Sequence, residues 1–111
     1  MRLLALLAGV VVLGGGSPSR AQVVEREYSV TLSRLHVKAG PAVIEVVNMG
    51  QDPHDLRVQR VGARHIAGTR VVAPGKRAEL SLKLPPGRYW VWCSVADHRA
   101  RGMRATLVVS R

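Results

Sequence analysis

The sequence has few of the cysteine and aromatic residues that usually cross-link or fill the core of a small protein. It contains one cysteine and no phenylalanine, and aromatic residues make up 4% of the chain. A single cysteine excludes an internal disulfide. In an exported protein an odd cysteine needs another role, such as pairing with a second chain, a reactive thiol or metal binding. Cys93 is therefore the first residue to explain.

Acidic residues are also scarce. The chain has 7 Asp and Glu against 17 Lys and Arg, a formal net charge of +10. Such a balance attracts acidic partners or anionic surfaces, or simply keeps the protein soluble, and it does not specify a fold. A basic domain often binds nucleic acid. The sequence has no nucleic-acid-binding motif, and the export predicted next argues against that class.

No apolar run is long enough to span a membrane, which takes about 20 residues. The longest run, residues 3–13, follows Arg2 and contains Gly9. The helix-breaking stretch 14–18 and the small-x-small pattern Ser19-Arg20-Ala21 come next. This order is typical of a secretory signal peptide. We expect a signal peptide at residues 1–21, cleavage after Ala21, and one mature domain at residues 22–111 in the periplasm, cell envelope or extracellular space.

A helical period is missing from the predicted mature chain. Apolar and polar residues alternate instead, which is the pattern of half-buried strands. Clusters of Pro, Gly, Asn and Asp between the alternating stretches are typical of turns. Residues 61–69 fit a loop, a short helix or a strand equally well. The sequence thus predicts an all-β sandwich or barrel, with strands at residues 27–32, 42–48, 56–59, 78–84, 89–93 and 104–109.

Three soft donor side chains follow one another at five-residue intervals near the C-terminus: Cys93, His98 and Met103. Thiolate, imidazole and thioether favour copper over Mg²⁺, Ca²⁺ or Mn²⁺, which prefer oxygen. Two His, one Cys and a long axial Met form the donor set of blue-copper electron-transfer centres. His54 is the candidate for the missing imidazole. Each residue alone has a commoner structural explanation, so the combination carries the prediction.

The same residues resemble the cupredoxin family of small type 1 blue copper proteins. The likeness runs from about Tyr28 to the C-terminus, and Asp97 stands where many relatives have glycine before the second histidine. It implies a Greek-key β-sandwich that binds one copper ion per chain, cycling between Cu(II) and Cu(I), through His54, Cys93, His98 and Met103. The motif residues that carry the likeness are Asn48, Gly50, Pro53, His54, Gly87, Tyr89, Cys93, His98, Gly102 and Met103.

The resemblance also implies an exported one-electron carrier, which we expect to be a monomer. Electrons would pass through the edge of His98. The basic residues Arg99, Arg101 and Arg104 near it predict a redox partner with an acidic docking face and rates that fall as salt rises. In relatives, a residue placed like Asp55 can bridge to the loop that bears the cysteine.

Other functions stay open at this point. The same ligands would serve a copper-delivery protein of the cell envelope, and a sandwich with a vestigial site is a weaker alternative. Zinc accepts Cys and His, but thioether is a poor zinc ligand. Enzymatic activity is not expected, because four protein ligands leave no open position for a substrate.

The remaining candidate side chains are interpreted as structural. Met49 is a rival thioether without a matching family position, and Asn48 is expected to shape the turn after its strand. His36 and His65 are expected to be solvent-exposed. Trp90 and Trp92 fall on the face opposite Tyr89 and Cys93, where packing against a neighbouring strand or loop is the preferred interpretation.

Overall fold

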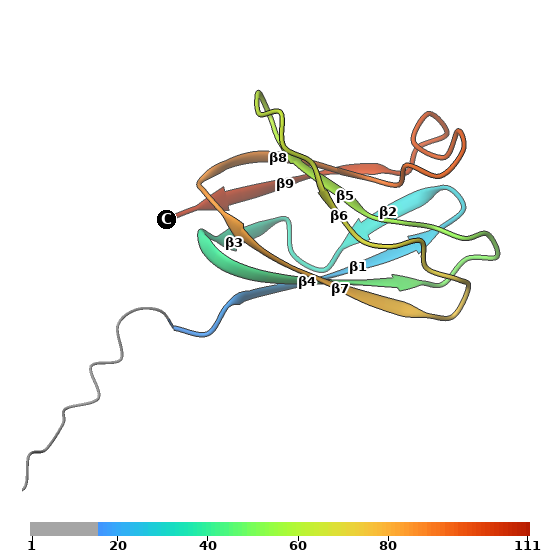
Figure 1. Ribbon diagram of the computed structural model, residues 1–111, viewed down its shortest axis with the longest axis horizontal. Coiled ribbons are helices and arrows are strands. Elements are labelled where there is room, and N and C mark those ends of the chain that lie inside the picture. The colour runs from blue at the N-terminus through green and yellow to red at the C-terminus, as the bar shows by residue number, and fades with distance from the viewer. Residues whose placement is uncertain (1–15) are drawn as a thin grey trace, which may run out of the picture.

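Two β-sheets packed face to face form the described part of the chain, residues 16–111 of a computed structural model (Figure 1). The predicted signal peptide falls mostly on residues 1–15, which lie outside it. Within residues 16–111 no helix has the length and apolar character needed to cross a membrane. The predicted all-β sandwich is confirmed for this part of the chain.

The first sheet has four strands in the order β2-β1-β4-β7. Strand β4 pairs in parallel with β1 and antiparallel with β7, whereas β1 and β2 form an antiparallel hairpin. The β1–β2 turn holds Glu27 and Tyr28. The bounds are β1 Ser19–Arg26, β2 Ser29–Leu32, β4 Gly40–Asn48 and β7 Arg77–Leu84.

The second sheet has five strands in the order β3-β9-β8-β5-β6. The pair β3 and β9 is parallel, and the other pairs are antiparallel. The chain therefore crosses between the sheets after β4, and this crossing segment carries His54. The bounds are β3 His36–Lys38, β5 Arg57–Arg60, β6 Ala67–Gly68, β8 Gly87–Trp92 and β9 Arg104–Ser110.

Alternate residues of the strands fill the space between the sheets. Burying apolar side chains in this way is the main favourable contribution to folding. The ligand candidates Cys93 and Met103 belong to the same buried cluster, so the core and the site are continuous. Fully buried members from the two sheets include Val23, Ile44, Val46, Val91 and Leu107.

Most predicted strands are confirmed to within a few residues, one is wrong at its start, and two were missed. Glu27 and Tyr28 lie in a turn and not in a strand, because β2 begins at Ser29. Strands β1 and β3 were not predicted; both form parallel pairs with distant segments, which a local pattern does not reveal. The undecided stretch 61–69 is mainly loop, with the two-residue strand β6 inside it.

The predicted signal-peptide cleavage site, after Ala21, lies inside strand β1. Ser19, Arg20 and Ala21 pair with Ala42, Val43 and Ile44 of β4. The side chain of Ala21 is buried. Cleavage after Ala21 would remove these three residues of the strand.

A chain that begins at residue 22 should be less stable than one that begins at residue 16. Three ladder pairings and some buried apolar area are lost, and the entropy of ordering three residues partly offsets that loss, so we expect about 1–3 kcal/mol. Denaturant titration of the two purified chains measures the difference. Equal midpoints and slopes would mean that these residues contribute nothing to the fold.

Candidate metal centre

The loops at one end of the sandwich bring three sequence-predicted ligands together. His54 lies between β4 and β5, where it forms an isolated bridge with Val72. Cys93 follows β8 directly, and His98 lies in the turn before β9. The backbone N–H of Met103 donates to the carbonyl of His98, and the N–H of Cys93 donates to the carbonyl of Met103. Met103 is thus tied to the same loop.

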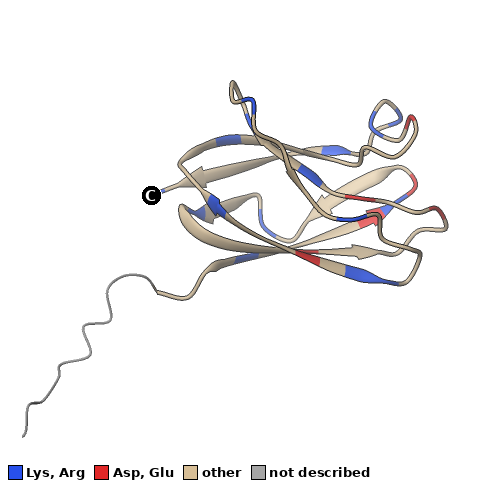
Figure 2. Cartoon of the chain, viewed as in Figure 1, with Lys and Arg blue, Asp and Glu red and all other residues tan. Residues whose placement is uncertain are grey.

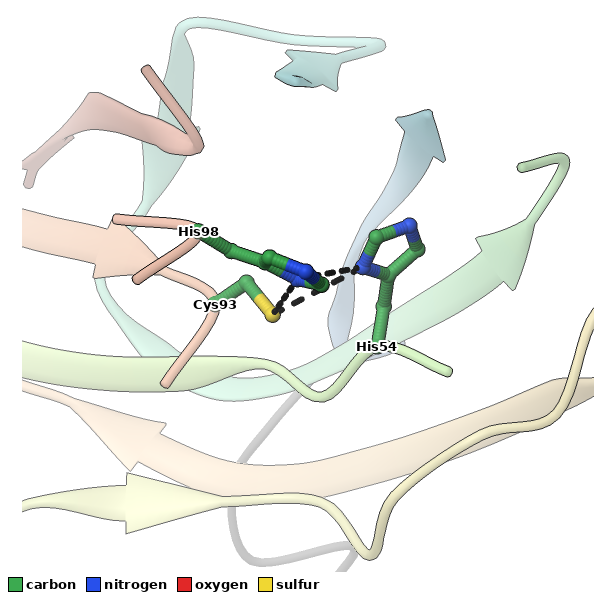
Figure 3. A group of neighbouring side chains, drawn as sticks. All are labelled: His54, Cys93 and His98. Atoms are coloured by element: carbon green, nitrogen blue, oxygen red, sulfur yellow. Dashed lines mark hydrogen bonds between the residues drawn. The ribbon is translucent and has the colours of Figure 1, made fainter. Parts of the chain in front are cut away.

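The donor atoms of His54, Cys93 and His98 form a small triangle (Figure 3). The two Nδ1 atoms are 3.2 Å apart. The Sγ of Cys93 lies 3.8 Å from Nδ1 of His54 and 3.7 Å from Nδ1 of His98. His54, Cys93 and Met103 are fully buried, and His98 is 5% exposed.

This triangle fits one metal ion. Metal–nitrogen distances of ~2.0–2.1 Å and a metal–sulfur distance of ~2.3 Å, as for zinc, place such donor atoms roughly 3.3–3.8 Å apart at angles of about 110–120°. The two sulfur–nitrogen separations of 3.8 and 3.7 Å fall in that range, and the nitrogen–nitrogen separation of 3.2 Å lies just below it. Thiolate and imidazole are the ligand types that suit copper and zinc. The residues present therefore fit a single copper site.

Two carboxylates face the outer nitrogens of the two imidazoles. Nε2 of His54 is 2.9 Å from Oε1 of Glu27, and Nε2 of His98 is 3.5 Å from Oδ2 of Asp52. A carboxylate accepts hydrogen bonds, so each contact favours the ring form with its proton on Nε2. In that form the Nδ1 atom of each ring is available to bind a metal ion beside Cys93.

Glu27 is held in place by the loop that carries His54. The backbone N–H groups of Gln51 and Asp52 donate to its carboxylate at 2.7–3.0 Å. Hydrogen bonds from Asp52 first and Gln51 second hold the pKa of Glu27 at about 2. A Cβ at Gly50 would collide with this carboxylate, so the loop leaves space for it.

The other residue of the β1–β2 turn, Tyr28, covers His98. The two rings meet edge to face, with centroids 5.4 Å apart. Arg101 lies over the Tyr28 ring, donates to its hydroxyl at 3.2 Å, and pairs with Asp97 at 2.8 Å. Glu27 and Tyr28 therefore cap one imidazole each. Sequence reasoning missed both roles, because the alternating pattern placed these residues in a strand.

The basic residues expected around His98 separate into two groups. Arg101 lies close to His98 through Tyr28. Arg99 lies over the ring of Trp92, with Cζ 4.3 Å from the centroid, and Arg104 donates to the carbonyl of Arg99. Arg99 and Arg104 thus belong to the outer face of the second sheet. The preferred packing of Trp92 against a loop is confirmed, whereas Trp90 is 45% exposed.

The expected bridge from Asp55 to the cysteine loop is confirmed. Its Oδ1 accepts from the backbone N–H of Ser94 at 2.6 Å, and its Oδ2 accepts from the Ser94 hydroxyl. Burial raises the pKa of the Cys93 thiol to about 11, although N–H groups of Asp55 and Val95 act in the opposite direction. A metal must therefore displace a proton from this thiol.

Asn48 shapes the turn after β4, as expected. Its amide nitrogen donates to the carbonyls of Asp52 and Val72, and its Oδ1 accepts from the N–H of Gly50. These bonds tie the His54 loop to the segment that pairs with His54. Asn48 thus fixes the backbone beneath the site.

The other side chains that could have served as metal ligands are exposed to solvent. Met49 is 55% exposed, in contrast to the buried Met103. His36 and His65 are solvent-exposed, as expected from the sequence.

Comparison with solved structures shows that this fold is the cupredoxin fold. No family model and no curated protein matches the sequence. Reduced auracyanin from Roseiflexus castenholzii aligns with a TM-score of 0.69 and 16% identity over 86% of this chain and 100% of that chain. Rusticyanin from Thiobacillus ferrooxidans gives 0.65 and 16% over 85% and 79%. A purple cupredoxin from Nitrosopumilus maritimus gives 0.60 and 23% over 81% and 99%.

Proposed function

We propose that this chain, which has the cupredoxin fold, binds one copper ion and carries single electrons between redox partners. The observation that supports this most directly is the convergence of Nδ1 of His54, Sγ of Cys93 and Nδ1 of His98 in a buried triangle. A further solved structure similar to this chain, auracyanin A from Chloroflexus aurantiacus, is described by its title as a "blue" copper protein.

Met103 is the proposed fourth ligand. It is fully buried and hydrogen-bonded through its backbone to both His98 and Cys93. A bound copper ion would supply the one-electron couple, and the chain would supply a fixed donor set. The thioether favours copper over zinc as the physiological metal, because zinc accepts sulfur mainly as thiolate.

The burial of the site supports electron transfer over copper delivery. Delivery requires that a partner reach the ligands, yet His54 and Cys93 are fully buried. The bridge from Asp55 to Ser94 ties the two ligand loops together, and the hydrogen bonds of Asn48 hold the His54 loop to the Val72 segment. Such a packed site moves little when the charge of the metal changes, and this suits repeated oxidation and reduction.

The biological setting is also part of the proposal. We propose that the protein is exported and works as a monomer without enzymatic activity, since four protein donors leave no position for a substrate. Its partner would present an acidic face. The exposed Trp90 and the basic Arg99 and Arg104 on the second sheet, together with Arg101 near His98, are the surface groups that would meet that face.

Loading the purified protein with Cu(II) should give one ion per chain and an intense visible absorption from thiolate-to-copper charge transfer. A voltammogram should be reversible, and a Cu(I) competitor should remove the metal slowly. Replacing His54 with alanine should abolish the absorption. The matched control is His65→Ala, which changes an exposed histidine and should leave the spectrum unchanged.

Two results would contradict the proposal in different ways. A colourless protein with tightly bound copper would rule out the blue-copper assignment. Rapid transfer of Cu(I) to the competitor, without a reversible couple, would favour copper delivery.

A further inference from the structure

Acidic residues gather at the metal-binding end of an otherwise basic chain. Five of the seven Asp and Glu residues lie there, although the chain as a whole has a net charge of +10 (Figure 2). Each of the five contacts a ligand, the loop of a ligand, or the core beside Cys93. The five are Glu25, Glu27, Asp52, Asp55 and Asp97.

Two of these carboxylates act directly on the ligands. Glu27 lies 2.9 Å from the outer nitrogen of His54, and Asp52 lies 3.5 Å from that of His98. Glu27 is fixed by two backbone N–H donors and by the space left at Gly50. Its position is therefore built into the loop. The side chain of Asp52 is 47% exposed, which leaves its charge better screened by water.

We propose that Glu27, assisted by Asp52, is a positioning residue that holds the imidazole rings with Nε2 protonated and biases the bound copper toward Cu(II). This inference rests on the proposed function. A negative charge stabilises the more highly charged oxidation state of a nearby ion. At an effective dielectric constant of about 20, one unit charge within about 10 Å of the ion changes the equilibrium between Cu(II) and Cu(I) more than tenfold. Buried surroundings act in the opposite direction, since they favour the state with the smaller net charge.

The reduction potential separates these effects. Glu27→Gln removes the charge but keeps the size of the side chain, so the Cu(II)/Cu(I) ratio at a given potential should fall by at least about tenfold, an upward shift of about 59 mV for a one-electron couple. Asp52→Asn should give a smaller upward shift, because water screens that carboxylate. The matched control is Glu79→Gln, an equal charge change on the exposed side of β7, which should shift the potential little.

A second readout does not require copper. Ring-nitrogen NMR of the metal-free protein should show His54 with a proton on Nε2 in the wild type, and Glu27→Gln should increase the form protonated on Nδ1 alone. If Glu27→Gln does not fold, Asp52→Asn and the NMR of wild-type His54 and His98 still decide the question.

The proposal is overturned if wild-type His54 is protonated on Nδ1 alone, or if the Glu27 and Asp52 variants shift the potential no more than Glu79→Gln does. Failure of the proposed function would look different, because the wild-type protein would then show no thiolate-to-copper absorption at all.

Discussion

Replacing Glu25 with glutamine should stabilise the metal-free protein by several kcal/mol at pH 8 and change its stability little at pH 4. Glu25 is fully buried on the face of β1 that also carries Ala21 and Val23. Neither of its carboxylate oxygens has a hydrogen-bond partner among residues 16–111. Glutamine has nearly the same shape and cannot ionise. The substitution therefore tests the charge of Glu25 and little else.

The direction of the effect follows from the pKa of Glu25. Burial first, and the negative charge of Asp55 second, raise this pKa from 4.5 to about 8 in the folded protein. Between these values the unfolded chain has lost the proton while the folded chain keeps it. Stability then falls as pH rises, by about 1.4 kcal/mol per pH unit. Over 8 − 4.5 = 3.5 units the loss is on the order of 5 kcal/mol, and it levels off above pH 8.

Denaturant titrations between pH 4 and pH 9 measure this effect. Other groups titrate in both proteins, so the quantity of interest is the difference between wild type and Glu25→Gln at each pH. Glu79→Gln serves as the control, since it removes an exposed carboxylate from the opposite face of the same sheet. Parallel curves for wild type and Glu25→Gln would show that Glu25 has an ordinary pKa.

The sequence was sufficient for those parts of the site that are local. Cys93, His98 and Met103 lie on one loop, so their spacing predicted a shared ligand role; the structure brings Cys93 and His98 together with His54, and the role of Met103 stays a prediction. His54 was found through its turn context and the family resemblance. The adjacent Asp55 was predicted to bridge the loops, and the Ser94 hydrogen bonds confirm it.

The parts that could not be predicted depend on distant segments. Glu27 and Tyr28 reach the two histidines because β1 pairs in parallel with β4, which places the β1–β2 turn beside the His54 loop. Period-two alternation describes which face a residue points to and says nothing about which strand lies beside it. The residues that cap the imidazoles were for that reason taken for a strand.

The net charge of the chain also did not predict how the charged residues are distributed around the site. The count of 17 basic and 7 acidic residues describes the surface as a whole and predicts attraction to acidic partners. It does not reveal that the carboxylates are concentrated around the ligands (Figure 2). The overall charge therefore does not reveal that carboxylates face the outer nitrogens of both imidazoles.

Replacing Cys93 with alanine should abolish the visible absorption of the copper-loaded protein and reduce copper affinity far more than any change outside the ligand set. The absorption requires a thiolate bound to the metal, and Cys93 is the single sulfhydryl of the chain. Loss of a partner that only orients a ligand costs about 10- to 100-fold in metal affinity. Loss of the thiolate itself should exceed that range. Spectroscopy and competition titration measure the two effects.

Unfolding cannot account for this result, because a small buried side chain changes little in volume. We expect Cys93→Ala to cost about 1–2 kcal/mol, well below the total stability of a typical domain. The wild-type affinity should also rise with pH, since the thiol has a pKa of about 11 and must release its proton on binding. The alanine variant should lose this proton release. Copper binding with unchanged affinity and pH dependence would exclude Cys93 as a ligand.

The second sulfur provides the matched comparison. Met103→Gln changes a side chain that is as deeply buried as Cys93 on the same loop. If Met103 is the axial ligand, this variant should keep the copper and its colour while the reduction potential falls, because the axial ligand tunes the potential. Two buried sulfurs would then give two different outcomes, loss of the chromophore and a shifted potential. General damage to the core would instead affect both variants in the same way.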